Sequence, residues 1–383
     1  MPRFLSTPLI QHGPGSLAEL GGIIQSLGGG RVGLITDPGL VKAGICERVV
    51  QAAGDLADDI VWFDGAEPEP SYELVGRCVA FLRDEHCQVV IGLGGGSALD
   101  TAKMSAVMVG NEGDVSDYFG AGRVPRPGLS SIAIPTTAGT GSEVSPAAVF
   151  VDPRDGTKKG VRSDYVQPKA AILDPELTLG LPQALTASTG IDALTHAIEC
   201  YTARAATLIG DMTAERAIAL IGEHLPVAYA DGANLVARDG MLMGSLIAGM
   251  ALAIANVGAV HALAQALGGS HHVHHGMANS LLLPYVMEFN RMACRGKYAR
   301  VAALLGEPVA GLSENAAAER AVAAVRQLTI DLQLPQHLRE LDIPEDALDD
   351  VAERTIATQG RIATNNPRAM SVEDARAILR AAY

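Results

Sequence analysis

Histidines crowd one short segment of the chain, and this crowding is its clearest chemical signal. The chain has 383 residues and ten histidines, and five of these lie close together: His261, His271, His272, His274 and His275. Upstream, the segment STGIDALTHAIE contains Asp192 and His196 at a spacing of four residues. A helix would project both side chains from one face, as two ligands of one metal require. We expect Glu199, in the same segment, to face a different direction from Asp192.

These segments together could hold a divalent metal. The predicted ligands, one carboxylate and three imidazoles, are Asp192, His196, His261 and His275. Such a set suits a borderline ion, Fe²⁺ or Zn²⁺, with room for a substrate oxygen. The ion can polarise an alcohol oxygen and lower its pKa, which favours the departure of a hydride from carbon. For any one histidine, a hydrogen-bonded and partly buried structural role is the alternative.

The remaining histidines are too many to be further ligands. We predict that one or more of them, His271 first, lines the site or relays protons, and that the rest are surface residues. His261 is expected in a helix that ends at Gly268-Gly269, and His275 in the loop that begins the next element.

A glycine-rich loop in the first half could bind phosphate. The segment VVIGLGGGSALDTAK, residues 89–103, predicts a strand, a glycine turn and a helix that starts with Ala98. Glycines let backbone N–H groups approach a pyrophosphate, and the helix N-terminus adds partial positive charge. The proposed contacts are Gly94, Gly95, Gly96 and Ser97. Alternatively, Ser97 caps the helix and forms a capping box with Asp100, which needs no ligand.

Two further features could complete a cofactor site. The loop IPTTAGTGSEVS, residues 134–145, offers four hydroxyl groups, those of Thr136, Thr137, Thr140 and Ser142. Asp37 follows the β-run Val32–Thr36, where a carboxylate can bind an adenosine ribose and would favour NAD over NADP. Each feature has a plain alternative, because tight turns use small polar residues and Asp37-Pro38 can simply open a turn.

The elements around these residues divide the chain in two. In the first half, β-runs (Val32–Thr36, Ile60–Phe63, Val89–Leu93, Ser131–Pro135) alternate with helical stretches (Leu40–Ala53, Ser71–Glu85). This alternation predicts an α/β domain with a parallel sheet, residues 1–181. From about Pro182 the pattern becomes helical, which predicts an all-helical domain, residues 182–383.

Composition excludes several classes of partner. The net charge of −14, without a stripe of Lys and Arg, argues against nucleic acid. The five cysteines are scattered and the N-terminal residues do not resemble an export signal, so we expect a cytoplasmic protein. The most apolar stretch, Met241–Ala266, contains Asn256, His261 and Gln265, which favours a buried helical hairpin over a membrane span.

Six segments, in their order and spacing, resemble the iron-containing (group III) alcohol dehydrogenases. They are GGGSALDTAK, PTTAGTGSE, AILDPELT, GIDALTHAIE, GAVHALAQALGG and HHGMANSLLLP, and the resemblance spans Ile10 to Pro284. It implies a dinucleotide-binding α/β domain and a helical metal domain, with the cofactor cleft between them. It also implies an NAD-dependent oxidoreductase of small primary alcohols, diols or the matching aldehydes, and we expect a homodimer or larger homo-oligomer.

The resemblance assigns roles to residues by their position in these motifs. Asp192, His196, His261 and His275 match the metal ligands, and the two loops match the cofactor loops, with Asp100 included among the cofactor-binding residues. Asp37 looks like the residue at the adenosine ribose. Lys158 or Lys159 lies where a cofactor-contacting lysine is usual, and we favour Lys159. His271 and His275 are the predicted catalytic histidines.

Three positions depart from the family pattern. Gln265 stands four residues after the third ligand, where a second histidine is usual, and an amide cannot carry a proton. The usual Pro-His-Gly is here HHVHHG, whose additional imidazoles could replace that relay. Glu69 stands where asparagine is common, which alters a local contact to the cofactor.

Other functions use parts of the same pattern. A lyase resembling dehydroquinate synthase, or a glycerol phosphate dehydrogenase, would need basic residues around a substrate phosphate, and none cluster beside Asp192, His196 or His261. A maleylacetate reductase would not need the metal, so the complete ligand set speaks against it. A nucleotide-binding or metal-storing protein without turnover would give no alcohol-dependent change in NADH absorbance.

Overall fold

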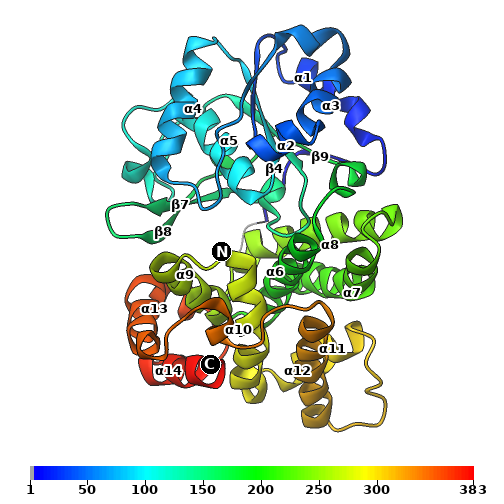
Figure 1. The fold of residues 1–383 in the computed structure, drawn as a ribbon, viewed down its shortest axis with the longest axis vertical. Helices are drawn as coiled ribbons and strands as arrows, with labels where there is room; N and C mark the ends of the chain where they lie inside the picture. Colours follow the sequence, from blue (N-terminus) through cyan, green and yellow to red (C-terminus); the bar gives the residue numbers. More distant parts are fainter. Residues whose placement is uncertain (1–3) are drawn as a thin grey trace. The chain divides into compact units, whose positions relative to one another are not determined.

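The computed structural model describes residues 4–383. The chain divides into two compact units, one of Leu5–Leu181 and the other containing Pro182–Tyr383. Both sheets belong to the first unit, whereas the second is built from helices (Figure 1).

A six-stranded sheet forms the centre of the first unit. Its strands, in spatial order, are β1 (Leu9–His12), β9 (Ala170–Leu173), β6 (Ser130–Pro135), β4 (Val89–Gly94), β2 (Val32–Ile35) and β3 (Ile60–Phe63). Every neighbouring pair is parallel. The residues of β2, β4 and β9 are all buried, because a parallel sheet is covered on both faces and its strands are therefore continuously apolar.

Five helices accompany the sheet: α1 (Leu20–Ser26), α2 (Pro38–Lys42), α3 (Ile45–Ala52), α4 (Tyr72–Asp84) and α5 (Gly96–Val109). Alternate strand residues pack on opposite faces. Leu34 and Ile91 belong to a core with residues of α1 and α3, whereas Ile35 belongs to a core with residues of α4 and α5. This period-two alternation places one helical layer on each side of the sheet.

A second, three-stranded sheet contains β5 (Gly120–Ala121), β8 (Thr157–Arg162) and β7 (Ala147–Asp152), in that order. The sequence pattern does not reveal it, because β8 contains two lysines and a glycine, which have low strand propensity. The single helix predicted over Leu40–Ala53 is also wrong. Gly44 has a φ of 73°, and this left-handed turn separates α2 from α3.

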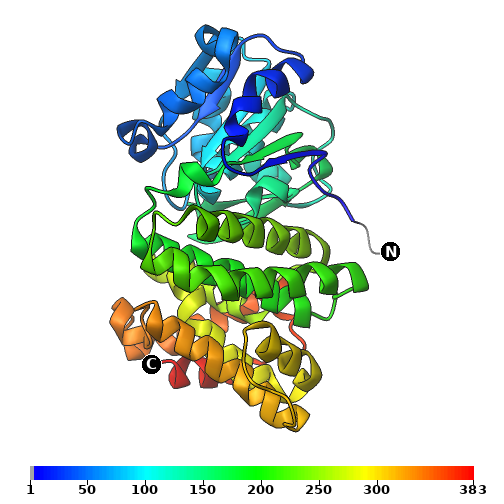
Figure 2. The same ribbon diagram turned by 90° about the vertical axis from the view of Figure 1, so that its right-hand side faces the viewer.

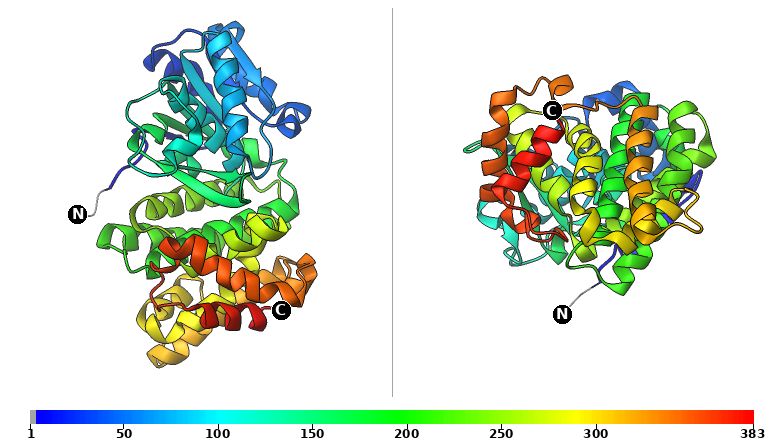
Figure 3. Two further views of the ribbon diagram at one scale, coloured as in Figure 1. Left: turned by 90° about the vertical axis from the view of Figure 1, so that its left-hand side faces the viewer. Right: turned by 90° about the horizontal axis from the view of Figure 1, so that it is seen from below.

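Within residues 4–383, the second unit contains nine α-helices: α6 (Gln183–Thr202), α7 (Leu208–Ala230), α8 (Leu235–Ala255), α9 (Ala259–His271), α10 (His275–Asn290), α11 (Arg295–Leu304), α12 (Glu314–Asp331), α13 (Leu348–Ala363) and α14 (Val372–Ala381). Helix α6 packs against α7, α8 and α10, and α10 packs against α9, α12 and α14. Figure 2 shows α7 and α8 side by side, and Figure 3 shows the neighbouring helices α13 and α14. The predicted fold class, a parallel α/β domain followed by a helical domain, is confirmed.

Helix α8 is the one described helix that is long and apolar enough to cross a membrane, judged by length and composition alone. Its packing against α6 and α7 is that of a core helix, and 56% of its most apolar window is buried. The predicted hairpin over Met241–Ala266 is wrong. Asn256, with a φ of 60°, ends α8, and α9 then packs against α10 and α13 rather than back along α8.

Candidate metal centre and glycine-rich loops

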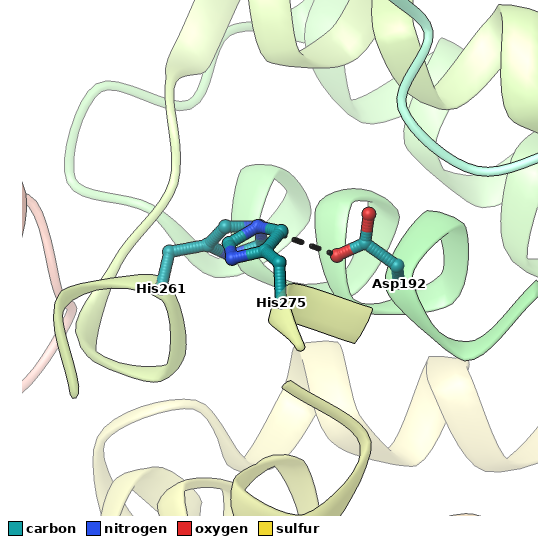
Figure 4. Close-up of side chains that lie close together, drawn as sticks. All are labelled: Asp192, His261 and His275. Carbon is teal, nitrogen blue, oxygen red and sulfur yellow. Dashed lines mark ion pairs between the residues drawn. The ribbon is translucent and has the colours of Figure 1, made fainter. Parts of the chain in front are cut away.

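Three helices of the second unit bring a carboxylate and two imidazoles together. Asp192 lies on α6, His261 in the first turn of α9, and His275 is the first residue of α10. One ligand atom from each lies within 4.8 Å of the others, and Figure 4 shows the three side chains converging. Helix α10 can approach α6 this closely because residue 276 is a glycine. A Cβ on Gly276 would lie only 2.7 Å from the carbonyl oxygen of Ser188 on α6.

Two imidazole nitrogens lie close to the carboxylate of Asp192. His261 Nε2 and His275 Nε2 lie 3.7 and 3.8 Å from Asp192 Oδ1. Burial alone would raise the pKa of Asp192, but the imidazoles of His196, His275 and His261 and a hydrogen bond from Asn279 together lower it below its usual value. The carboxylate is therefore held ionised, as a metal ligand must be.

His196 reaches the cluster in a different way from the other three predicted ligands. Its ring stacks on that of His261, with centroids 4.6 Å apart and an interplanar angle of 25°. The set of ligand atoms within 4.8 Å comprises Asp192, His261 and His275, without His196. The structure thus brings all four residues together and gathers the ligand atoms of three.

Asn279 lies among the ligand atoms and was not predicted from the sequence. Its Nδ2 donates to Asp192 Oδ1 at 2.6 Å and lies 3.1 Å from His275 Nε2 and 3.3 Å from His261 Nε2. Its buried Oδ1 has no hydrogen-bond partner among residues 4–383. Because the amide group donates to the ionised carboxylate beside the two imidazole Nε2 atoms, a positive charge is favourable at this position, and these residues fit a cation. In the sequence, Asn279 could have been found by its spacing of four residues from His275, because a helix places residues at that spacing on one face.

Glu199 faces the same cluster, so the expectation that it faces away from Asp192 is wrong. Seven residues are nearly two helical turns of about 3.6 residues each, which returns Glu199 to the same face of α6. Its Oε2 lies 2.6 Å from His261 Nδ1, and its Oε1 accepts a hydrogen bond from Val260 N at 2.7 Å. A carboxylate at Nδ1 requires a proton there, which leaves the Nε2 lone pair of His261 facing the cluster.

The other crowded histidines lie at the junction of α9 and α10. Helix α9 continues past Gly268-Gly269 to His271, so it ends two residues beyond the predicted end. His271 is half-buried, and its Nδ1 lies 2.7 Å from Ser270 Oγ. His272, which ends α9 with a φ of 55°, and His274 are exposed. The proton-relay role of His271 remains a prediction.

In the first unit, the glycine loop joins β4 directly to α5. Gly94 has a φ of 144°, and a Cβ there would lie 2.8 Å from that of Ala98, so this position requires glycine. Helix α5 begins at Gly96 with Gly95 as its N-cap, two residues before the predicted start. The predicted caps are therefore wrong: Ser97 lies inside the first turn, and Asp100 instead accepts hydrogen bonds from Ser142 Oγ and Val149 N.

The second loop packs against the first. A Cβ on Gly96 would lie 2.6 Å from Thr140 Cγ2, and one on Gly95 would lie 3.5 Å from Thr137. The backbone N of Thr136 donates to the carbonyl oxygen of Gly94 at 3.0 Å. The two predicted cofactor loops are therefore neighbours, although they lie far apart in sequence.

Asp37 and the glycine loop flank the switch point of the sheet. From β2 the chain moves outward to β3 and then returns to the opposite side of β2 as β4, which is where open α/β sheets bind ligands. Asp37 caps α2 through Oδ1, which accepts from Gly39 N and Leu40 N. Its Oδ2 would lie 3.5 Å from a Cβ on Gly94. The turn-opening role of Asp37 is thus observed, and its second oxygen faces the glycine loop.

The two candidate lysines differ in their surroundings. Lys159 Nζ pairs with Asp152 at 2.7 Å and Asp155 at 2.6 Å, inside its own β7–β8 hairpin. Lys158, with 8% of its side chain exposed, pairs with Glu69 in the loop after β3. Glu69 has a φ of 53°, a conformation that asparagine tolerates better than glutamate.

Comparisons with known proteins cover nearly the whole chain. Residues 8–175 match the model of the iron-containing alcohol dehydrogenases, and residues 186–383 match that of the C-terminal part of the Fe-containing alcohol dehydrogenase family. The chain is 39% identical to a 1,3-propanediol dehydrogenase of Klebsiella pneumoniae, over 97% of this chain and 96% of that protein.

Solved structures agree with these matches. The crystal structure of a 1,3-propanediol oxidoreductase is similar over 100% of both chains, with a TM-score of 0.96 and 38% identity. That of a sulfoacetaldehyde reductase from Bifidobacterium kashiwanohense in complex with NAD⁺ covers 100% of this chain and 98% of that one, with a TM-score of 0.90 and 29% identity.

Proposed function

Because the chain belongs to the iron-containing alcohol dehydrogenase family, we propose that it uses NAD(H) and a divalent metal, Fe²⁺ before Zn²⁺. The resemblance stated from the sequence motifs is confirmed. The chain is an oxidoreductase that acts on the CH–OH group of alcohols or on the matching aldehydes. The cofactors, the metal and the residues that hold them are the proposal.

The observation that carries the proposal is the cluster on α6, α9 and α10. Asp192, His261 and His275 would hold the metal, with His196 as the fourth ligand. Asp192 supplies the negative charge, and Glu199 keeps Nδ1 of His261 protonated so that Nε2 remains a donor to the metal. When bound, the metal supplies a Lewis acid that lowers the pKa of a substrate hydroxyl, and NAD supplies the hydride acceptor.

The first unit would bind the dinucleotide at the switch point of its sheet. Backbone N–H groups of Gly95, Gly96 and Ser97 at the start of α5 would bind the pyrophosphate. Asp37 Oδ2 would accept hydrogen bonds from the adenosine ribose, which favours NAD over NADP. The hydroxyl groups of Thr136, Thr137 and Thr140 would line the cofactor beside the glycine loop.

For the lysine contact, the structural surroundings support Lys158 rather than Lys159, which the sequence favoured. Lys159 is engaged by two aspartates of its own hairpin, whereas Lys158 pairs with Glu69 after β3. The carboxyl ends of parallel strands meet at one edge of a sheet, so Glu69 lies at the edge that carries Asp37 and the glycine loop.

The substrate is proposed to be a small primary alcohol, a diol or the matching aldehyde. Similar proteins are named for a neutral diol and for the anionic sulfoacetaldehyde, so family membership alone does not set the charge of the substrate. Gln265 has no titratable group, and we propose that His271 carries the proton that an alcohol loses, whereas His275, the other predicted catalytic histidine, acts as a metal ligand. A cytoplasmic homodimer or larger homo-oligomer completes the proposal.

The test follows NADH absorbance with purified protein loaded anaerobically with Fe²⁺ or with Zn²⁺. Short aldehydes, diols and phosphorylated aldehydes serve as substrates, and His261→Ala serves as the inactive control. We expect metal-dependent NADH oxidation that the variant lacks. Bound NADH without turnover on any substrate would contradict the proposed substrate class, and turnover that survives chelation and His261→Ala would contradict the metal site.

A further inference from the structure

Asn366, in the connection between α13 and α14, meets the start of α9. The residue is buried, and its Oδ1 accepts a hydrogen bond from the backbone N of Ala259, the first residue of α9, at 3.4 Å. Glu199 Oε1 accepts from the next backbone N, that of Val260, at 2.7 Å. The N-cap residue, Gly258, has no side chain that could cap the helix. The first two N–H groups of α9 therefore depend on acceptors from distant parts of the chain.

Gly258 allows both acceptors to reach the helix. A Cβ at this position would lie 3.1 Å from Glu199 Oε1 and 3.2 Å from Asn366 Oδ1, so a side chain here would push against both groups. The two acceptors thus converge on one point of the backbone. His261, a predicted metal ligand, lies three residues after Gly258, so the place where α9 begins decides where this imidazole lies.

A reciprocal pair of amides fixes Asn366 itself. Asn290, the last residue of α10, donates through Nδ2 to Asn366 Oδ1 at 2.8 Å and accepts from Asn366 Nδ2 at 2.7 Å. Asn366 Nδ2 also donates to the carbonyl oxygen of Arg368 at 2.6 Å. With the bond from Ala259 N, the amide of Asn366 makes all four hydrogen bonds that such a group can make. Aspartate could not donate and glutamine is longer, so this position requires asparagine.

The preceding residue, Asn365, anchors the same connection to other helices. Just beyond the end of α6, Arg204 N donates to the carbonyl oxygen of Asn365 at 2.9 Å, and Ala205 N donates to its Oδ1 at 3.1 Å. Asn365 Nδ2 donates to the carbonyl oxygens of Ala255 and Val257, both at 2.9 Å, where α8 leads into α9. The three helices that carry the predicted ligands, α6, α9 and α10, are thus all bonded to two adjacent asparagines.

We propose that Asn366 is a positioning residue of the metal centre, which caps the start of α9 and so holds His261 where its imidazole can share a metal with Asp192 and His275. It acts through the backbone of α9 rather than by contacting the metal. A buried amide with every bond made selects one arrangement, because a shift of α9 would leave buried polar groups without partners. The inference rests on the proposed metal site and adds to it how a distant segment holds one ligand in place.

The experiment measures the affinity of full-length protein for Zn²⁺ in competition with a chelator. Asn366→Ala removes the acceptor of Ala259 N and both bonds to Asn290, and we expect the Kd for Zn²⁺ to rise roughly tenfold. Asn290→Ala leaves the acceptor of Ala259 N in place but less firmly held, so the Kd should rise by a smaller factor. The absorption spectrum of the Co²⁺-loaded protein, which reports ligand geometry, should change in Asn366→Ala. A role in stability alone would lower the melting temperature without either change.

Asn234→Ala is the matched control for lost stability. Asn234 is the N-cap of α8, a helix of the same unit without a predicted ligand, and its Oδ1 accepts from Ala237 N at 3.0 Å. This variant should melt at a lower temperature and keep the wild-type Kd for Zn²⁺.

The outcomes separate the inference from the proposed function. If wild type binds neither Zn²⁺ nor Co²⁺, the proposed metal site fails and the positioning role fails with it. If wild type binds them, but Asn366→Ala and Asn290→Ala hold Zn²⁺ as tightly as Asn234→Ala does, the positioning role alone is refuted. Asn290→Ala decides by itself should Asn366→Ala not fold.

Discussion

Replacing Glu199 by glutamine should weaken metal binding without removing a ligand. The carboxylate of Glu199 contacts His261 Nδ1 through one oxygen and accepts from Val260 N through the other. Glutamine has the same size, but it has one acceptor where two are needed. If its oxygen faces Val260 N, its amide favours the tautomer of His261 that carries the proton on Nε2, the metal-facing atom. If the amide is flipped so that its oxygen faces His261, its NH₂ group faces Val260 N, which then has no acceptor.

The magnitude follows from the bond that is lost. A hydrogen bond to a charged group is worth about 1.5–3 kcal/mol, and about 1.4 kcal/mol corresponds to a factor of ten in affinity. We therefore expect the metal dissociation constant to rise roughly 10- to 100-fold, which is also the usual effect of losing a residue that orients a ligand. With the metal saturating, the loss of turnover should be smaller than this factor.

The assay is competition for Zn²⁺ with a chromogenic chelator, supported by the visible absorption spectrum of the Co²⁺-loaded protein. Glu215→Gln is the matched control, because Glu215 is a hydrogen-bonded carboxylate in the same unit that contacts Tyr201 and Arg300 instead of the cluster. Equal metal affinity in Glu199→Gln, Glu215→Gln and wild type would refute the orienting role of Glu199.

Three further predictions follow from the first unit. Burial raises the pKa of Glu143 to about 7, above its usual 4.5, so the folded state holds a proton that the unfolded chain releases between these values. Urea titration gives the free energy of unfolding of wild type and of Glu143→Gln at each pH. The difference, wild type minus variant, should fall by about 1.4 kcal/mol per pH unit as pH rises from about 4.5 to about 7, and it should level off above that range. A difference that does not change with pH would contradict this. Gly96→Ala places a Cβ 2.6 Å from Thr140 Cγ2, whereas one on Gly22 meets nothing within 4 Å. Gly96→Ala should therefore weaken NADH binding by roughly tenfold, as overpacking costs about 1–3 kcal/mol, and the Kd of Gly22→Ala should stay at the wild-type value. Burial raises the pKa of Cys78 to about 12, so a thiol reagent should modify it in the native protein far more slowly than in urea, and equal rates would contradict its burial.

Much of the site follows from contacts that are local in sequence. The spacing of Asp192 and His196 correctly places both on one helix, and the glycine turn correctly lies between a strand and a helix. The motifs identify the family, because six of them occur in one order. Errors arise where one residue's backbone conformation decides the outcome, as at Gly44, or where a competing partner lies elsewhere in the fold, as for Asp100.

By itself, the sequence determines the main strands and helices around the site, the family and the ligand types, since each depends on residue identity at short spacing. The tertiary structure alone decides which distant groups meet. Glu199 contacts His261 across 62 residues of sequence, and Lys103 bonds to Ser142 across 39. These partners are chosen by how helices and loops pack, for instance where Gly276 lets α10 approach α6. Such packing depends on the whole buried surface, which no local pattern contains.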